Sequence, residues 1–396
     1  MERKKQININ LKYIHQLDKD DIFRDYKNLF KKPGKNIYFG ANTLGLTPKA
    51  TRNNINNFLD DLSKKAVIGW RDSSWLNINK ELGTEISKII GSRSGNVILS
   101  DSTSVNLFKL LFSAIKLVKN RRFILTDDKN FPTDYYIISS IAKEFGLRVK
   151  VVPRKKLIEN IDKDVSVVTT TQVDFVTSEV LSLSKLAKKC KTYGAISLID
   201  LSHSVGILPL YLDKWGVDFA VGCTYKYLNG GPGSPAFIYV NNKYLEKADI
   251  IIKGWFGHIK PFDFNNHYVP SKGIEKFLTG TPSIISMKQL ETSLKIFCQI
   301  NLEKLRKKSL KQTSIMTDLI LRYKNINKIQ IISPSNILRG GHIAMKHKNA
   351  SKLLEIYEKN GLIGDFRPPN IIRFGISPLY NSYKDIWNAS KIINNL

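Results

Sequence analysis

The stretch Gly222-Cys223-Thr224-Tyr225-Lys226-Tyr227-Leu228-Asn229-Gly230-Gly231-Pro232-Gly233 places one lysine between two tyrosines, just before a glycine-rich turn. Upstream, Asp200 ends the strand-like run of residues 195–199. A lysine and a carboxylate at neighbouring strand ends suit pyridoxal phosphate, because the amine can form a Schiff base with the aldehyde and the carboxylate can keep the pyridine nitrogen protonated. The stretch therefore predicts an enzyme whose difficult chemistry is supplied by this cofactor.

Strand-like and helix-like runs alternate around this segment. Short apolar runs at residues 97–99, 122–125, 149–152, 165–168, 196–199 and 236–240 are interleaved with helical patterns at 105–116, 135–145 and 183–193. This alternation predicts an α/β fold with a mostly parallel sheet that carries helices on both faces. Sheets of this kind bind ligands at the carboxyl ends of their strands, and Asp200 and Lys226 are expected there.

The pattern changes after Pro282. A largely helical tract over residues 284–323, broken at most once, precedes strands at 329–332 and 342–345, a helix at 350–359, a strand at 371–374 and a helix from 383. We expect an N-terminal arm of residues 1–45 packing on the small domain, a large cofactor-binding domain of residues 46–285, and a smaller α+β C-terminal domain of residues 286–396.

Composition excludes several classes of protein. The 396 residues are 42% hydrophobic, which is ordinary for a globular chain, and no apolar run reaches the length of a membrane span. The charged start, Met1-Glu2-Arg3-Lys4-Lys5, is not followed by an apolar signal region. The three cysteines are widely spaced and predict neither a disulfide framework nor a metal site. A cytoplasmic location without a membrane partner is expected.

The formal net charge of +28 raises the question of nucleic-acid binding. The lysines are scattered along the chain, with no arginine-rich arm and no recognisable binding module. A solvated basic surface is therefore favoured, with no nucleic-acid partner. Such a surface can still steer an anionic ligand towards a cleft.

Several further segments are specific in combination: Tyr38-Phe39-Gly40-Ala41-Asn42-Thr43-Leu44-Gly45, Ser104-Val105-Asn106-Leu107, Phe131-Pro132-Thr133-Asp134, Asp200-Leu201-Ser202-His203, Gly254-Trp255-Phe256-Gly257-His258, and Ile372-Arg373-Phe374 with Pro378-Leu379-Tyr380-Asn381. Together with the lysine segment they resemble the kynureninase family. The resemblance implies a pyridoxal-phosphate hydrolase of fold type I, aminotransferase class V-like, with a seven-stranded type of sheet and a smaller C-terminal domain.

The resemblance also implies residue roles. Lys226 would hold the cofactor and move the α-proton of the substrate, Asp200 would pair with the pyridinium nitrogen, and Tyr225 would act as an acid. Arg373 would clamp the substrate carboxylate through a bidentate contact. Other cofactor contacts would come from His203, Phe131, Asp134, Thr103, Ser104, Trp255 and Thr281, and other substrate contacts from Thr43, Trp70 and Thr281. Apart from the resemblance, most of these residues equally fit helix caps, core aromatics or surface charges.

The chain departs from the family pattern where the aryl group of the substrate is expected. Trp70 stands near the place of a family histidine, Val176 in place of a tyrosine, and Gly280-Thr281 in place of Ser-Asn. A site that hydrogen-bonds one group discriminates against substrates that lack it. These changes predict that the pocket accepts a substrate with a different side chain, or that its preference for one aryl group is relaxed.

The predicted function is hydrolysis of the Cβ–Cγ bond of kynurenine, or of a related or modified aryl-keto amino acid, to an aromatic acid and alanine, as in tryptophan catabolism. One alternative is a pyridoxal-phosphate lyase or aminotransferase of the same fold acting on a different amino acid in a specialised biosynthetic pathway. Another is an inert protein that binds nucleic acid through its basic surface. By analogy with the fold, we expect a homodimer with active sites at the subunit boundary.

Overall fold

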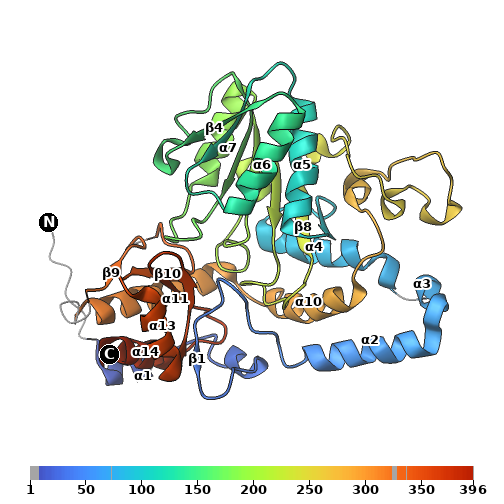
Figure 1. Cartoon of the computed structure of the whole chain (residues 1–396). Helices are drawn as coiled ribbons and strands as arrows, with labels where there is room; N and C mark the ends of the chain where they lie inside the picture. Colours follow the sequence, from blue (N-terminus) through green and yellow to red (C-terminus); the bar gives the residue numbers. More distant parts are fainter. Residues whose placement is uncertain (1–8, 73, 323–327, 336, 396) are drawn as a thin grey trace.

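The alternating segments form one central sheet. In the computed structural model (Figure 1), which describes residues 9–72, 74–322, 328–335 and 337–395, its strands lie in the order β2-β8-β7-β6-β5-β3-β4. The strands are β2 (Val97–Ser100), β3 (Phe123–Asp127), β4 (Arg148–Val152), β5 (Val165–Thr171), β6 (Ile196–Asp200), β7 (Phe219–Gly222) and β8 (Ala236–Val240). Only the pairs of β8 with β2 and β7 are antiparallel, which confirms the predicted mostly parallel sheet.

Helices cover both faces of this sheet. One face packs on α5 (Thr103–Leu117) and α6 (Pro132–Glu144), and the other on α4 (Ile78–Ile90), α7 (Leu183–Tyr193) and α10 (Ile284–Phe297). Side chains of β6 alternate between the two cores, with Leu198 in the first and Ile199 in the second. Burial on both faces explains the continuous apolar runs of these strands.

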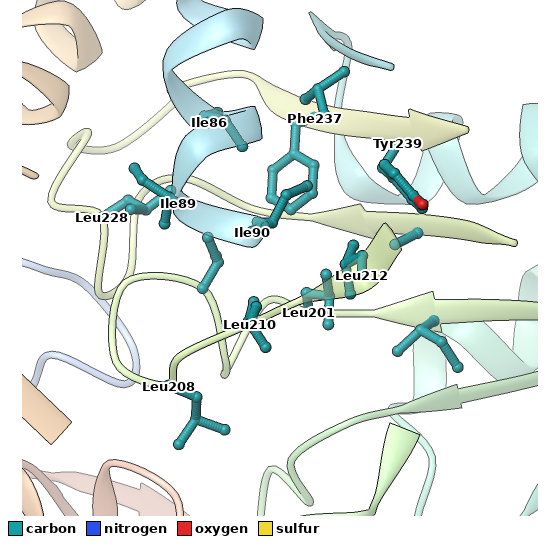
Figure 2. Close-up of a cluster of buried hydrophobic side chains, with 14 of the residues drawn as sticks. Ile86, Ile89, Ile90, Leu201, Leu208, Leu210, Leu212, Leu228, Phe237 and Tyr239 are labelled. Carbon is teal, nitrogen blue, oxygen red and sulfur yellow. The ribbon is translucent and has the colours of Figure 1, made fainter. Parts of the chain in front are cut away.

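The packing of α4 fixes the strand that leads to the lysine segment. Figure 2 shows Ile86 and Ile90 of α4 close to Phe237 of β8, the neighbour of β7. A Cβ added at Gly222 would lie 2.6 Å from a ring atom of Phe237. Glycine is therefore required at the end of β7, because the Phe237 ring fills that space.

The small domain is built on an antiparallel sheet in the order β12-β13-β10-β9. Its elements are β9 (Gln330–Ile331), β10 (His342–Lys346), β12 (Asp365–Arg367), β13 (Ile371–Gly375), α11 (Leu302–Leu321), α13 (Ala350–Lys359) and α14 (Tyr383–Asn395). The predicted helical tract breaks between α10 and α11, where Asn301 caps α11 by accepting a hydrogen bond from the Lys304 N–H at 3.0 Å. The last residue of that tract, Tyr323, lies outside the described residues.

The N-terminal segment lies against the small domain. Helix α1 (Leu11–Lys19) packs on α14, and β1 (Ile37–Tyr38) pairs in parallel with β11 (Leu362–Ile363). Ile14 and Phe39 share a core with Phe374. Residues 1–8 of the expected arm and Leu396 lie outside the described residues, and the division into three parts stays a prediction.

The described part of the chain also contains the long helix α2 (Thr51–Lys65) and the short helices α3 (Gly69–Asp72), α8 (Leu212–Trp215) and α9 (Asn242–Leu245). None of the helices in the described ranges combines the length and the apolar character that crossing a membrane requires.

Candidate active site

One large cavity opens at the carboxyl ends of the parallel strands. Its volume is about 580 Å³, and it is bordered by residues that end or follow β5, β6 and β7. The predicted site residues that line it are Thr103, Ser104, Phe131, Asp134, Asp200, His203, Tyr225, Lys226 and Thr281. The lysine and the carboxylate that motivated the cofactor prediction thus share one cavity.

The lysine loop is held closely from the N-terminal side of the chain. The Gly45 N–H donates to the Tyr225 carbonyl at 2.8 Å, and a Cβ on Gly45 would lie 2.1 Å from the Lys226 carbonyl oxygen. Asn229 donates its backbone N–H to the same Lys226 carbonyl at 2.9 Å and adopts a left-handed φ of 57°. The backbone on both sides of Lys226 is therefore fixed before any ligand binds.

Two buried carboxyl groups face the lysine. Asp200 accepts a hydrogen bond from the Ser202 N–H at 2.7 Å, and burial raises the pKa of its carboxyl although the Lys226 ammonium opposes this. Burial and the nearby Asp200 raise the pKa of Asp134 well above its usual range. A cation placed against Asp200 would lower the pKa of this carboxyl.

A pair of buried histidines lies beside the carboxyls. Burial, with Lys226 and Arg373 adding to it, lowers the pKa of His203 well below its usual range, so its imidazole is neutral. Its ring meets His342 edge-on at 5.8 Å between centroids. Among the described residues, His203 Nδ1 and the nearby Thr171 Oγ1 have no hydrogen-bond partner, as expected where a ligand is to bind.

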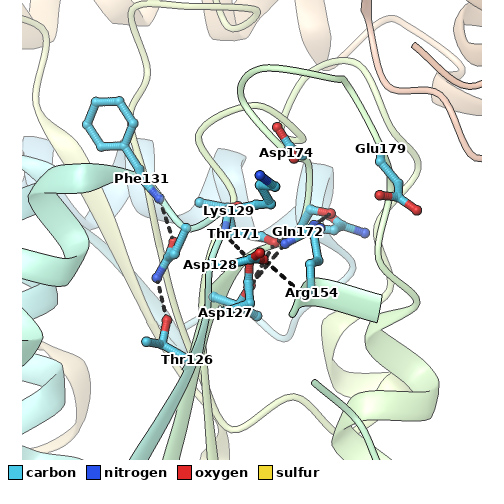
Figure 3. Close-up of polar contacts among 12 residues, drawn as sticks. Thr126, Asp127, Asp128, Lys129, Phe131, Arg154, Thr171, Gln172, Asp174 and Glu179 are labelled. Carbon is cyan, nitrogen blue, oxygen red and sulfur yellow. Dashed lines mark hydrogen bonds and ion pairs between the residues drawn. The ribbon is translucent and has the colours of Figure 1, made fainter. Parts of the chain in front are cut away.

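Phe131 is placed by a polar network at the ends of β3 and β5 (Figure 3). Arg154 is buried and bonds Asp127 of β3 at 3.3 Å and the carbonyls of Thr171 and Gln172 at 3.0 Å. Phe131 is the N-cap of α6, and its N–H donates to the Asn130 side chain at 2.9 Å, which in turn donates to the Thr126 hydroxyl at 3.0 Å. The Phe131 ring meets Phe175 edge-on at 5.2 Å between centroids, and both residues line the cavity.

The N-terminus of α5 offers an anion site. Thr103 and Ser104 open this helix as predicted, and Ser102 caps it by accepting from the Val105 N–H at 3.4 Å. Free backbone N–H groups and the helix dipole favour a phosphate at such an end. Beside it, the buried Lys109 donates to Asp101 at 2.5 Å and to the Phe277 carbonyl at 2.7 Å, and sequence reasoning missed this pair.

These residues fit pyridoxal phosphate. Lys226 would hold the aldehyde, Asp200 the ring nitrogen, and the N-terminus of α5 the phosphate. In the described part of the chain, no group of histidine, cysteine and acidic residues is arranged to hold a metal ion.

Arg373 and Thr43 do not line the cavity. Arg373 is fully buried in β13 and donates from Nε and Nη2 to Asp365 at 2.7 and 2.5 Å. The same guanidinium donates to the Phe175 carbonyl and to the Thr43 hydroxyl. Asp365 was missed by sequence reasoning, although it stands two residues before Arg367 in a segment whose charges alternate with apolar side chains.

Trp70 and Trp255 also lie away from the cavity wall. Both rings contact Phe256, at 6.4 Å for Trp70 and 4.6 Å for Trp255 between centroids. The Trp255 ring also contacts the rings of Phe262 and Phe264, which are exposed. The roles predicted for these two tryptophans stay predictions.

Comparison with known proteins identifies the family. Residues 305–393 match the family model described as the kynureninase C-terminal domain. A kynureninase of Pseudomonas fluorescens is 34% identical over 390 residues, covering 96% of this chain and 94% of the relative. The chain belongs to the kynureninase family. A second kynureninase, from Deinococcus radiodurans, is 32% identical and covers 96% of this chain and 95% of its own.

Solved structures agree with the fold expected of a kynureninase-family member. A C-DES variant with glycine covalently linked to its PLP cofactor has a TM-score of 0.82 at 13% identity, covering 93% of this chain and 99% of its own. A cysteine desulfurase from Thermococcus onnurineus has a TM-score of 0.81 at 17% identity, covering 94% and 97%. The predictions of fold type I, of an enzyme and of pyridoxal phosphate as its cofactor are confirmed.

Proposed function

We propose that this kynureninase-family protein is a hydrolase that cleaves the Cβ–Cγ bond of kynurenine, or of a related aryl-keto amino acid, to an aromatic acid and alanine. The observation that carries the proposal is the single cavity shared by Lys226, Asp200 and the N-terminus of α5. Bound pyridoxal phosphate would supply an electron sink for the charge that develops on the substrate.

Residues of the chain transfer the protons and hold the cofactor in place. Lys226 Nζ accepts the α-proton and returns a proton, and Asp200 keeps the ring nitrogen of the cofactor protonated. Neutral His203 and Phe131 would contact the ring of the cofactor, and Asp134 would form a hydrogen bond within the cofactor site. Water adds to the γ-ketone of the substrate, and the Cβ–Cγ bond then breaks to release the aromatic acid.

Tyr225 is the candidate acid beside the lysine. Lys226 Nζ lies 5.7 Å from the centroid of the Tyr225 ring. The neighbouring Cys223 and burial raise the pKa of the Tyr225 phenol, so the hydroxyl keeps its proton at neutral pH. It can therefore donate a proton late in the reaction.

The site is completed by a second subunit in this proposal. Trp255 lies outside the cavity wall, next to a segment that exposes Ile259, Phe262 and Phe264, the last 76% exposed. Exposed apolar side chains clustered on one segment are typical of an interface. In a homodimer, Trp255 would contact the phosphate of the partner's cofactor, whereas Thr281 lines the cavity of its own chain and would contact the cofactor there. Sedimentation of the holoenzyme at twice the chain mass supports this, and a monomer at micromolar concentration contradicts it.

The deciding experiment is incubation of the holoenzyme with L-kynurenine and L-3-hydroxykynurenine, with assays for alanine and for the anthranilates. Equal amounts of the two products are expected. No product from a fully loaded enzyme would reject this substrate class and favour a lyase or aminotransferase acting on another amino acid.

The pocket wall offers a specificity test. A Cβ added at Gly280 would meet nothing within 4 Å, and the side of the cavity at this residue is open. We expect Gly280→Ser to fold normally and to place a hydroxyl beside the aryl group. A change in the ratio of kcat/KM for kynurenine and 3-hydroxykynurenine would indicate that Gly280 lies beside the aryl group. An unchanged ratio would indicate that Gly280 does not contact this group.

A further inference from the structure

The two hydrogen-bonding edges of the Arg373 guanidinium have different partners, one charged and one neutral. Its Nε–Nη2 edge is filled by the Asp365 carboxylate, at 2.7 and 2.5 Å. Its Nη1–Nη2 edge meets only neutral acceptors, the Phe175 carbonyl and the Thr43 hydroxyl, the latter at 3.2 Å. Phe175 lines the cavity and Asp365 does not, so the second edge is the one bonded to a residue of the cavity wall.

A ligand carboxylate gains most at this second edge. Replacing two neutral acceptors by a carboxylate exchanges ordinary hydrogen bonds for a charge-assisted bidentate pair. Replacing Asp365 would exchange one carboxylate for another and leave the displaced one buried, since its side chain is only 12% exposed. The arrangement therefore favours a bound state in which Asp365 stays in place.

Other groups keep Asp365 where it is. The Thr43 hydroxyl donates to Asp365 Oδ2, and Arg367 Nη2 lies 3.4 Å from the same oxygen. Asp365 and Arg373 face each other across the β12–β13 pair, so the backbone ladder sets their register. Hydrogen bonding to Arg373, with help from Thr43, keeps the pKa of the Asp365 carboxyl low in spite of burial.

We propose that Asp365 is a positioning residue, which holds the Arg373 guanidinium so that its Nη1–Nη2 edge receives the α-carboxylate of the substrate in place of the Phe175 carbonyl and the Thr43 hydroxyl. The proposal rests on the proposed function only in taking an α-amino acid as the substrate. Asp365 touches no reacting atom and acts through Arg373.

The test compares L-alanine with L-alaninamide, which lacks the carboxylate. The holoenzyme is titrated with each, and binding is followed by the visible absorbance of the bound cofactor. We expect Asp365→Asn to weaken L-alanine binding about tenfold or more, as for loss of a hydrogen bond to a charged group, and to change L-alaninamide binding less than about twofold. An unchanged or tighter affinity for L-alanine overturns the proposal.

Asp365→Glu separates positioning from charge. Glutamate keeps the carboxylate but adds one methylene, so it cannot reproduce the two side-on bonds. A positioning role predicts that the preference for L-alanine over L-alaninamide falls severalfold in this variant. If neutralising Arg373 were the only role, the preference would be retained, and the proposal would be wrong. This variant also serves if Asp365→Asn does not fold.

Asp21→Asn is the matched control. Asp21 forms an equally buried pair with Lys308 at 2.6 Å, apart from the residues that line the cavity. The control should lose stability and keep its preference for L-alanine. Loss of the preference in the control as well would assign the effect to general destabilisation. Alanine release from kynurenine is measured separately. If kynurenine is not cleaved, the proposed function is wrong, but the preference for L-alanine over L-alaninamide still tests the role of Asp365.

Discussion

Asp200 and Lys226 reach the same cavity from two neighbouring parallel strands. Asp200 is the last residue of β6 and Lys226 follows β7 by a short loop, and the two strands pair from Leu198↔Phe219 to Asp200↔Val221. Their separation is thus set by the backbone ladder, not by flexible side chains. This relationship makes the lysine the first residue to test.

Lys226→Arg keeps the positive charge but cannot form an imine with an aldehyde. We expect loss of the visible absorbance of the aldehyde-bound cofactor and a fall in kcat of about 10³-fold or more, because in the proposed function Lys226 both holds the cofactor and moves the proton. Lys129→Arg, at an exposed position on the loop after β3, is the matched control and should retain both. Retained absorbance in Lys226→Arg would contradict the assignment.

Asp134 should make the cofactor-free protein less stable at neutral and alkaline pH. Burial and Asp200 raise its pKa in the folded state, so stability from this group is present at low pH and is lost as the pH rises. Asp134→Asn has the shape of the neutral acid. Urea unfolding should find the variant more stable than the wild type at pH 8 and equal to it near pH 3.5; equal stability at both would refute this view of the site.

His342 predicts an acid-sensitive fold. Burial and Arg373 lower the pKa of its imidazole to about 3, whereas an unfolded histidine titrates near 6.5. The unfolded state therefore binds the extra proton first, and at pH 5 the group removes about 2 kcal/mol of stability relative to pH 7.5. His342→Gln should make the stability change between these pH values smaller by that amount in urea unfolding. Identical changes in the two proteins would mean that His342 is protonated when folded.

Arg154 should matter more for stability than exposed ion pairs do. Its pair with Asp127 is almost completely buried, with side chains 5% and 0% exposed, and breaking such a pair costs about 3–5 kcal/mol. Arg154→Met tests this by urea unfolding. Arg122→Met is the control, because its pair with Asp164 is 70% and 36% exposed and is worth at most about 1 kcal/mol. Similar losses of unfolding free energy in the two variants would contradict the expectation that the buried ion pair contributes more than the exposed one.

The sequence was sufficient for elements with a strong local signal. The apolar runs of β2, β5, β6 and β8 and the helical patterns of α5 and α7 were predicted within a few residues. Strand β7 was missed because two of its four residues, Ala220 and Gly222, are of types that are depleted in strands. Its place is set by pairing with β6 and β8, which no local pattern contains.

The candidate site shows the same limit. The cofactor end was predictable because Lys226, Asp200, Thr103 and Ser104 each end or follow a strand, and parallel strand ends converge. Asp365 and His342 could not be found in this way. Both belong to the small domain. The contact of Asp365 with Arg373 depends on the pairing of β12 with β13, and the contact of His342 with His203 joins segments far apart in the chain.

The parallel pairing of β1 with β11 has a consequence for biosynthesis. Ile37 pairs with Leu362, and the Asn381 amide donates to the Tyr38 carbonyl at 3.1 Å, so an early segment is anchored by one that leaves the ribosome long after it. The nascent chain can complete its central sheet first, whereas the hydrogen bond between Thr43 and Arg373 can form only after Arg373 has left the ribosome. The part of the cavity around Lys226 can therefore form during translation, whereas the contacts of Arg373 with Thr43 and Asp365 form only near its completion.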